Sequence, residues 1–235
     1  TTRIYGYDNF EVNTASAPLY PVRVFEEKNV EEQIKDILVK RFSLHEVHSY
    51  IWAYADEYKK LGIAVEENVK LRGAANPNIE TIRRSLVPTQ LCQVRSNVSF
   101  ASDFGIFEIG RVVDGLDENG LCKEKKMLGI TLFSKILSAE ELYFRLTDML
   151  SVVIDDIRHK PLSYRGIEAD HDYVHPKNYN AVLCDGKELG KTGLVYPTVL
   201  RKIDKKANDV SAELEIKEIA NTKNAGRKYN ETEKF

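Results

Sequence analysis

The sequence predicts an α+β fold in which a mainly antiparallel sheet is flanked by helices. Three observations predict it: an amphipathic pattern from Asn29 to Phe42, a helix start at Ser138, and short apolar segments between residues 162 and 216 that are separated by turn residues. With 43% hydrophobic residues in a chain of 235, there is enough apolar surface for a packed core.

The first predicted helix runs from Asn29 to Phe42. Its apolar side chains recur every three or four residues and so share one face, while charged residues fill the other. The apolar stripe consists of Val30, Ile34, Ile37, Leu38 and Phe42. Periodicity shows an apolar face but not what covers it. The stripe is therefore either a candidate subunit interface or a cover for the chain's own sheet.

The segment from Leu44 to Tyr54 alternates aromatic and β-branched residues, which predicts a strand covered on both sides. A second helix is predicted from about Ser85, because Pro88 is tolerated in a first turn and apolar residues follow at helical spacing. The inward-facing residues of this helix are Leu91, Val94 and Val98.

A pair of strands is predicted next, from Phe104 to Val113 and from Met127 to Phe133. The residues from Asp114 to Gly120 between them have the composition of a turn. The order strand, turn, strand predicts two neighbouring antiparallel strands.

The clearest helix start is Ser138, which is followed three residues later by Glu141. In such a capping box, each side chain accepts a hydrogen bond from the other residue's backbone amide. The apolar stripe that follows consists of Leu142, Leu146, Met149, Leu150, Val153 and Ile157. Four short strands are predicted after this helix, at 162–165, 179–184, 188–195 and 210–216. Asp185 and Gly186 supply a hairpin turn between two of them.

Composition excludes several functional classes. The formal net charge of -2 gives no general electrostatic reason to bind nucleic acid, so any RNA contact must be local. Cys92, Cys122 and Cys184 are far apart, which argues against a zinc site and favours reduced, mostly buried thiols. No apolar run reaches the roughly 20 residues of a membrane span. We therefore expect a cytoplasmic protein with no membrane contact.

Five motifs, in order along the chain, resemble those of phenylalanyl-tRNA synthetase β chains. The most characteristic are Ile82-Arg83-Arg84-Ser85-Leu86-Val87-Pro88 and Phe107-Glu108-Ile109-Gly110-Arg111-Val112. The others are 3–9 (Arg-Ile-Tyr-Gly-Tyr-Asp-Asn), 175–200 with its His-Pro, Asp-Gly-Lys and Pro-Thr-Val-Leu elements, and 213–216 with Tyr229 and Phe235. Two departures, at Asn76-Pro77 and at Lys177, leave open whether the chain is a housekeeping β chain or a divergent paralogue.

The resemblance implies a class II aminoacyl-tRNA synthetase-like domain, and it implies which chemistry is missing. Class II sites fix the phosphates of ATP with arginines and a metal. One such arginine would be expected just after Val113, where this chain has Asp114. The Gly-rich segment that ends in a second arginine also has no counterpart after Tyr196. We therefore predict no catalytic, cofactor-binding or metal-binding residue in this chain.

Other features have ordinary explanations. Asp155-Asp156 and the stretch from Asp170 to Asp172 are expected in solvated turns, not in a metal site. His171 and His175 suit a loop in which one histidine caps backbone groups. The basic run from Arg201 to Lys206 reads better as a solvated helix end than as a phosphate contact.

The resemblance implies a function through shape. It predicts a non-catalytic module of the phenylalanine-tRNA ligase β subunit, which supports ATP-dependent charging of tRNA(Phe) by pairing with the catalytic α subunit in an α2β2 heterotetramer. ATP and magnesium would bind elsewhere in the holoenzyme. The alternatives are a free-standing β-chain-like interaction module and a small-molecule ligase that reuses the fold.

The predicted organisation has three parts. Residues 1–27 are a linker and the tail of a preceding domain, 28–220 form the class II-like domain, and 221–235 are an exit linker. Because the chain lacks an initiator Met and ends in the charged stretch Glu233-Lys234-Phe235, we expect it to be cut from a longer polypeptide.

Overall fold

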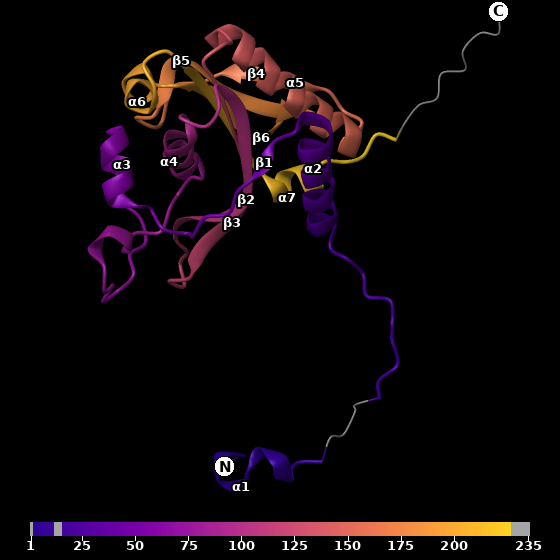
Figure 1. Cartoon of the computed structure of the whole chain (residues 1–235). Coiled ribbons are helices and arrows are strands. Elements are labelled where there is room, and N and C mark those ends of the chain that lie inside the picture. Colours follow the sequence, from indigo (N-terminus) through magenta and orange to yellow (C-terminus); the bar gives the residue numbers. More distant parts are fainter. Residues whose placement is uncertain (1, 12–15, 227–235) are drawn as a thin grey trace, which may run out of the picture.

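A computed structural model describes residues 2–11 and 16–226 of the chain. Its centre is a seven-stranded sheet with the order β1-β2-β3-β7-β6-β5-β4 (Figure 1). All neighbouring strands are antiparallel except β1 and β2. The strands are β1 (His45–Glu46), β2 (Asp103–Leu116), β3 (Cys122–Ser134), β4 (Leu162–Gly166), β5 (Val174–Cys184), β6 (Lys187–Val195) and β7 (Asn208–Glu215). The predicted α+β class with mainly antiparallel strands is confirmed.

Helices cover both faces of the sheet, so the core has two layers. On one face lie α2 (Glu26–Phe42), α5 (Ala139–Arg158) and α7 (Ile216–Asn221). On the other lie α3 (Ala55–Leu61), α4 (Val87–Asn97) and α6 (Pro197–Ile203), which Figure 1 shows together on one side. Because each strand buries alternate side chains toward opposite faces, both layers are apolar.

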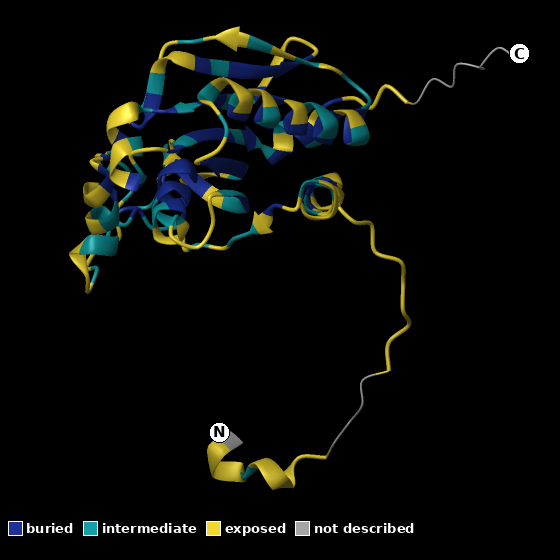
Figure 2. Cartoon of the chain, turned by 45° about the horizontal axis from the view of Figure 1, so that its top comes forward, coloured by how far each residue is buried: buried dark blue, intermediate teal, exposed yellow. Residues whose placement is uncertain are grey.

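The N-terminal part of the chain leads into α2 as an extended segment. Residues 16–25 form no helix or strand, and Figure 2 shows this stretch exposed. Before it lie α1 (Thr2–Tyr5) and a 3-10 turn (Tyr7–Asn9). None of the helices in the described ranges combines the length and apolar character that a membrane span requires.

The two long helices follow their predictions. α2 begins three residues before the predicted start and ends at Phe42, as predicted. α5 begins with the predicted capping box, in which Ser138 Oγ accepts a bond of 3.2 Å from the amide of Glu141, and Glu141 Oε2 accepts one of 2.8 Å from the amide of Ser138. These bonds satisfy backbone donors that have no partner inside a helix.

The β2–β3 hairpin is longer than predicted. β2 continues to Leu116, so the start of the predicted turn, including Asp114, lies in the strand. The reversal is made by Asp117, whose Oδ1 accepts hydrogen bonds from the amides of Asn119 (2.9 Å) and Leu121 (2.8 Å). This side chain mimics a backbone turn, as Asp commonly does.

The predicted strand from Leu44 to Tyr54 is wrong over most of its length. His45 and Glu46 pair with β2 and the amide of Val47 donates to Phe107, but Tyr50 is 75% exposed. The later backbone amides and carbonyls pair with another segment instead: the amide of Ala53 donates to Thr81, and Ile51 accepts from Arg83. The segment therefore crosses from one neighbour to another, which its alternating pattern could not reveal.

Each of the four strands after α5 begins at or before its predicted first residue. β5 starts at Val174, so His175 lies in a strand and not in a loop, but its Nδ1 does accept a bond from the backbone amide of Lys177. Asp185 and Gly186 form the predicted hairpin turn, with φ of 52° and 76°. α3 and α7 were not predicted, and of α6 only the basic end was, where Arg201 and Lys202 lie in the last turn as expected. Of the predicted exit linker at 221–235, residues 227–235, including Tyr229 and Phe235, lie outside the described residues.

Candidate functional site

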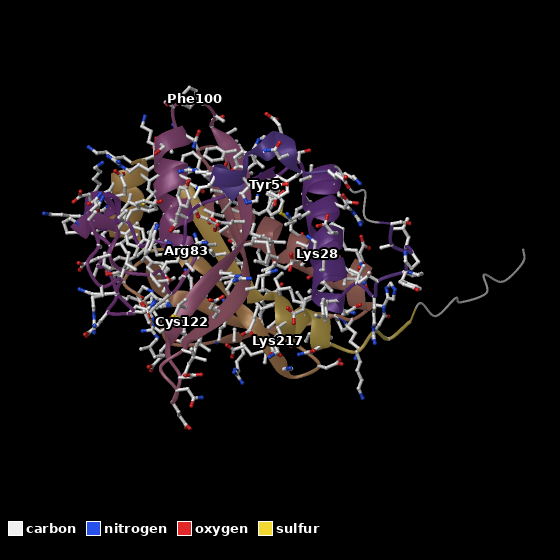
Figure 3. All side chains as sticks on the ribbon, turned by 90° about the horizontal axis from the view of Figure 1, so that it is seen from below. Tyr5, Lys28, Arg83, Phe100, Cys122 and Lys217 are labelled. Carbon is white, nitrogen blue, oxygen red and sulfur yellow. The ribbon has the colours of Figure 1, made fainter. Side chains whose placement is uncertain are left out.

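The segment that leads into α4 is fixed to β2 by a buried ion pair. Arg83 Nη2 lies 2.9 Å from Glu108 Oε1, and the two side chains are 2% and 3% exposed. Glu108 Oε2 accepts a second bond of 2.6 Å from Ser49 Oγ, and Arg83 Nε donates to the carbonyl of Arg111 at 3.1 Å. Figure 3 shows Arg83 within the body of the molecule. A buried ion pair needs such additional bonds, because desolvating both charges is costly.

Gly110 lets this ion pair approach β2 closely. A Cβ atom at position 110 would lie 2.6 Å from Arg83 Nη2 and 2.8 Å from Glu108 Oε1, which is closer than real Cβ contacts come. The two most characteristic sequence motifs, 82–88 and 107–112, therefore pack against each other. The residues that define these two motifs therefore have a structural role that does not depend on a substrate.

A second anchor joins β7 to the start of α4. Glu213 Oε1 accepts a bond of 2.7 Å from the amide of Leu86, and Oε2 accepts one of 2.8 Å from Ser85 Oγ. Loss of hydration raises the pKa of Glu213, although these bonds oppose the rise. The carboxylate lies at a helix N-terminus, where a negative charge is favoured.

Beside these anchors, the α4 face of the sheet carries a cavity of about 450 Å³. Strands β2, β3, β5, β6 and β7 contribute to its base, and residues near 66 and 170 form its rim. Its charged and aromatic lining consists of Glu66, Arg84, Asp114, Lys125, Asp170, His171, Tyr173, Tyr179, Glu188, Lys191, Glu213, Glu215 and Glu218.

Carboxylates dominate this lining: it contains seven acidic side chains and only three lysines or arginines. Each of the three cations is paired with a carboxylate of the lining. Arg84 lies 2.5 Å from Asp114, Lys125 lies 3.7 Å from Glu215, and Lys191 pairs with Asp170. A polyphosphate that entered would meet an excess of negative charge, which is repulsive at these short distances.

Asp114, predicted as the replacement of the class II arginine, lies on the rim of this cavity. Its hydrogen bond from Arg84 holds the pKa of the carboxyl below its ordinary value, so it stays ionised. Residue 114 therefore faces the cavity, but its carboxylate forms an ion pair with Arg84 and supplies no positive charge.

The rim is closed by His171, which joins two loops. Its Nδ1 lies 2.5 Å from Glu66 Oε1, its Nε2 lies 3.6 Å from Asp170 Oδ1, and its ring stacks on Tyr173 with centroids 4.9 Å apart. Burial opposes protonation of His171, but the bond to Glu66 and the nearby carboxylates outweigh it and raise its pKa. Within the described residues, no cluster of histidine, cysteine, aspartate and glutamate suits a metal ion.

The predicted interface stripe lies on the opposite face of the sheet. Val30, Ile34 and Leu38 are each 0% exposed and pack in the chain's own core with α5 and β3. Ile37 and Phe42 are partly buried against the same core. The intramolecular alternative accounts for the three buried residues, so a contact of α2 with another subunit would have to use the remaining ones.

The sequence prediction named Asp114 but missed Glu66, Arg84 and Glu213 as lining residues. Arg84 and Glu213 both lie in the quoted motifs, but their proximity depends on the tertiary fold. The expectation that Asp155 and Asp156 lie in a solvated turn is wrong: both lie in the last turns of α5, where Asp156 pairs with Arg41 at 2.7 Å. Of the three free cysteines, Cys184 is buried, Cys92 is partly buried and Cys122 is exposed, so the expected burial holds only in part.

Comparisons with known proteins agree on one family. A family model described as the phenylalanyl tRNA synthetase beta chain CLM domain matches residues 12–216. The phenylalanine–tRNA ligase beta subunit of Leptospira borgpetersenii is 26% identical over 231 residues, which cover 96% of this chain and 28% of that protein. That of Syntrophus aciditrophicus is 24% identical, covering 99% and 30%, and that of Pyrococcus abyssi is 26% identical, covering 83% and 34%. The chain thus spans only a minor part of these relatives' length.

Proposed function

Because the chain belongs to the phenylalanyl-tRNA synthetase β chain CLM domain family, we propose that it is a non-catalytic structural module of phenylalanine–tRNA ligase. In this proposal it supports ATP-dependent charging of tRNA(Phe) in the cytoplasm. It pairs with the catalytic α subunit in an α2β2 heterotetramer, and the α subunit binds ATP and magnesium. The antiparallel sheet flanked by helices is compatible with a class II synthetase-like domain.

The observation that carries the non-catalytic part is the ion pair between Asp114 and Arg84 within an acid-rich cavity. Adenylate formation needs cations that are free to stabilise charge developing on a phosphate. Here the cavity's cations are engaged with its own carboxylates. Binding ATP would require breaking those pairs and then placing a polyanion beside the released carboxylates.

A pairing surface is assigned to the part of α2 that the core leaves uncovered. Val39 is 45% exposed, and Phe42, three residues further along the helix, is only partly buried. An apolar side chain in such a position gains free energy when a partner covers it. The proposal therefore moves the contact from the predicted stripe to the exposed side of α2 around Val39.

The pairing is tested by co-purification of the α subunit from the same organism with tagged chain. Val39→Asp should reduce capture at least tenfold, because an unpaired carboxylate would be buried in the contact. Ile136→Asp is the matched control: Ile136 is 71% exposed and lies outside α2, so capture should not change. Urea unfolding curves should show both variants folded. Equal capture by Val39→Asp and Ile136→Asp would reject the assignment to α2.

The alternatives are separated by two measurements. Calorimetric titration with ATP, with and without magnesium and phenylalanine, should give no heat of binding; binding in the micromolar range would favour a ligase that reuses the fold. If wild-type chain neither captures the α subunit nor binds ATP, the free-standing interaction module is favoured.

A further inference from the structure

Basic side chains gather where the C-terminal ends of three helices converge. Their proximity follows from contacts: the ammonium group of Lys202 fills the space beside Gly62, the residue that caps α3. Lys135 Nζ bridges the ends of α4 and α6, lying 2.9 Å from the carbonyl of Val98 and 3.0 Å from Asp204 Oδ2. Figure 1 shows the three helices on the same side of the sheet. We call the basic patch Lys59, Lys60, Arg95, Arg201, Lys202, Lys205 and Lys206.

Arg95 belongs to this group although it lies on α4. Burial raises the pKa of the Cys92 thiol to about 12, and Arg95 and Lys60 are both near enough to oppose the rise. The two cations from different helices therefore lie around the same thiol. The sequence shows only the run from Arg201 to Lys206, and the fold brings the other three cations to it.

The cations of the patch are mostly available for a partner. Among the described residues, only Lys60 forms an ion pair, with Glu57 at 2.5 Å. The nearby Asp204 is held by Lys135. Favourable interaction with helix C-termini explains one or two basic residues in a last turn. It does not explain Lys205 and Lys206, which follow α6.

An exposed aromatic residue borders the patch. Phe100, which is 84% exposed, lies just beyond α4 and two residues after Val98, the acceptor of the Lys135 bond. Figure 3 shows its side chain at the edge of the molecule. Unpaired cations beside an exposed ring match the needs of RNA, whose phosphates bind cations and whose unpaired bases stack on aromatic rings. An acidic peptide without aromatic residues would use the cations but would leave the ring uncovered.

We propose that the basic patch binds the phosphate backbone of tRNA, with Phe100 against an unpaired base. The inference rests on the proposed function for the identity of the RNA, and it adds a contact surface to it. Contacts to phosphates fix the position of the RNA on the protein and do not depend on its nucleotide sequence. A nearly neutral chain can therefore bind RNA locally, because seven of its 34 basic residues gather in this patch and none of the patch residues lines the acidic cavity.

The test measures fluorescence anisotropy of a labelled tRNA(Phe) transcript with the 235-residue chain over a range of salt concentrations. The patch variant is Arg201→Gln/Lys202→Gln/Lys205→Gln. Its matched control is Lys123→Gln/Lys177→Gln/Lys217→Gln, which removes three exposed lysines without ion pairs among the described residues and thus the same total charge. We expect the patch variant to weaken binding about tenfold or more. The negative slope of log K against log salt should become less steep by about 2 to 3, because three phosphate contacts are lost. The control should change binding less than about twofold.

Phe100→Ala and a labelled polyglutamate peptide identify the kind of partner. Weaker tRNA binding by Phe100→Ala, with polyglutamate bound poorly by wild-type chain, supports RNA. Equal losses in the patch variant and the lysine control overturn the proposal, and so does polyglutamate binding as tight as that of tRNA. The capture assay with the α subunit gives an independent result. If capture fails but tRNA binding depends on the patch, only the proposed function is refuted. If the α subunit is captured but tRNA binding does not depend on the patch, only the patch proposal is refuted.

Discussion

Replacing Arg83 by methionine tests whether the buried ion pair holds α4 on the sheet. Methionine keeps an unbranched stem but removes the donors to Glu108, to Ser49 Oγ at 2.5 Å and to the carbonyl of Arg111. Glu108, whose side chain is 3% exposed, would remain buried without a counter-ion. Breaking such a pair from one side costs about 3 to 5 kcal/mol of unfolding free energy.

The assay is urea unfolding followed by far-UV circular dichroism. A domain with an unfolding free energy above about 8 kcal/mol, within the ordinary range of about 5 to 15 kcal/mol, keeps a measurable transition after this loss. The double variant Arg83→Met/Glu108→Leu removes both charges, so it should cost less than the sum of the single changes by about 1 to 3 kcal/mol. Arg111→Met is the control, because its ion pair with Glu124 is exposed and worth about 1 kcal/mol or less.

Two results would refute this reasoning. A loss in Arg83→Met no larger than that in Arg111→Met would mean that the buried pair contributes little. Strictly additive costs in the double variant would mean that Arg83 and Glu108 act independently.

Two further predictions concern the same face of the sheet. Gly110→Ala should cost about 1 to 3 kcal/mol in the same assay, because its Cβ would crowd the ion pair, whereas Gly166→Ala, whose Cβ would lie 3.9 Å from the nearest atom, should be close to neutral. The pKa of His171 is raised in the folded protein, so its pair with Glu66 stabilises the fold fully below the ordinary value of 6.5, and this stabilisation is lost as pH rises through the folded pKa. The pKa of Glu66 is lowered, so its contribution is present above 4.5 and is lost as pH falls through the folded pKa. His171→Gln should therefore lower the urea midpoint most between these two values and least in alkali, and a pH-independent difference would contradict the pair.

Local patterns were sufficient for the long elements. α2 and α5 each have a continuous apolar stripe, and α5 also has the capping residues Ser138 and Glu141. The hairpin turn at Asp185 and Gly186 was visible because both residues have positive φ, which few residue types adopt easily. In contrast, α3, α6 and α7 are only 7, 7 and 6 residues long, which is too short for a periodic signal.

The segment after α2 shows why pattern reading failed elsewhere. Alternation from Leu44 to Tyr54 correctly predicts extended backbone at His45 and Glu46. It cannot show that Ala53 donates to Thr81 while Val47 donates to Phe107, since hydrogen-bond partners are set by distant parts of the chain. A strand is defined by its neighbours, and an isolated pattern contains no information about them.

The sequence by itself determined the fold class, the family resemblance and the carboxylate at position 114, because each depends on residue identity or local spacing. Tertiary structure decided what those residues contact. It directed most of the α2 stripe to the chain's own core, paired Asp114 with Arg84, and joined Ser85 to Glu213 across 128 positions. It also brought the end of α3, with Lys60, to the basic run from Arg201 to Lys206. Charge neutralisation and burial are properties of neighbouring atoms in space, which residue order alone does not specify.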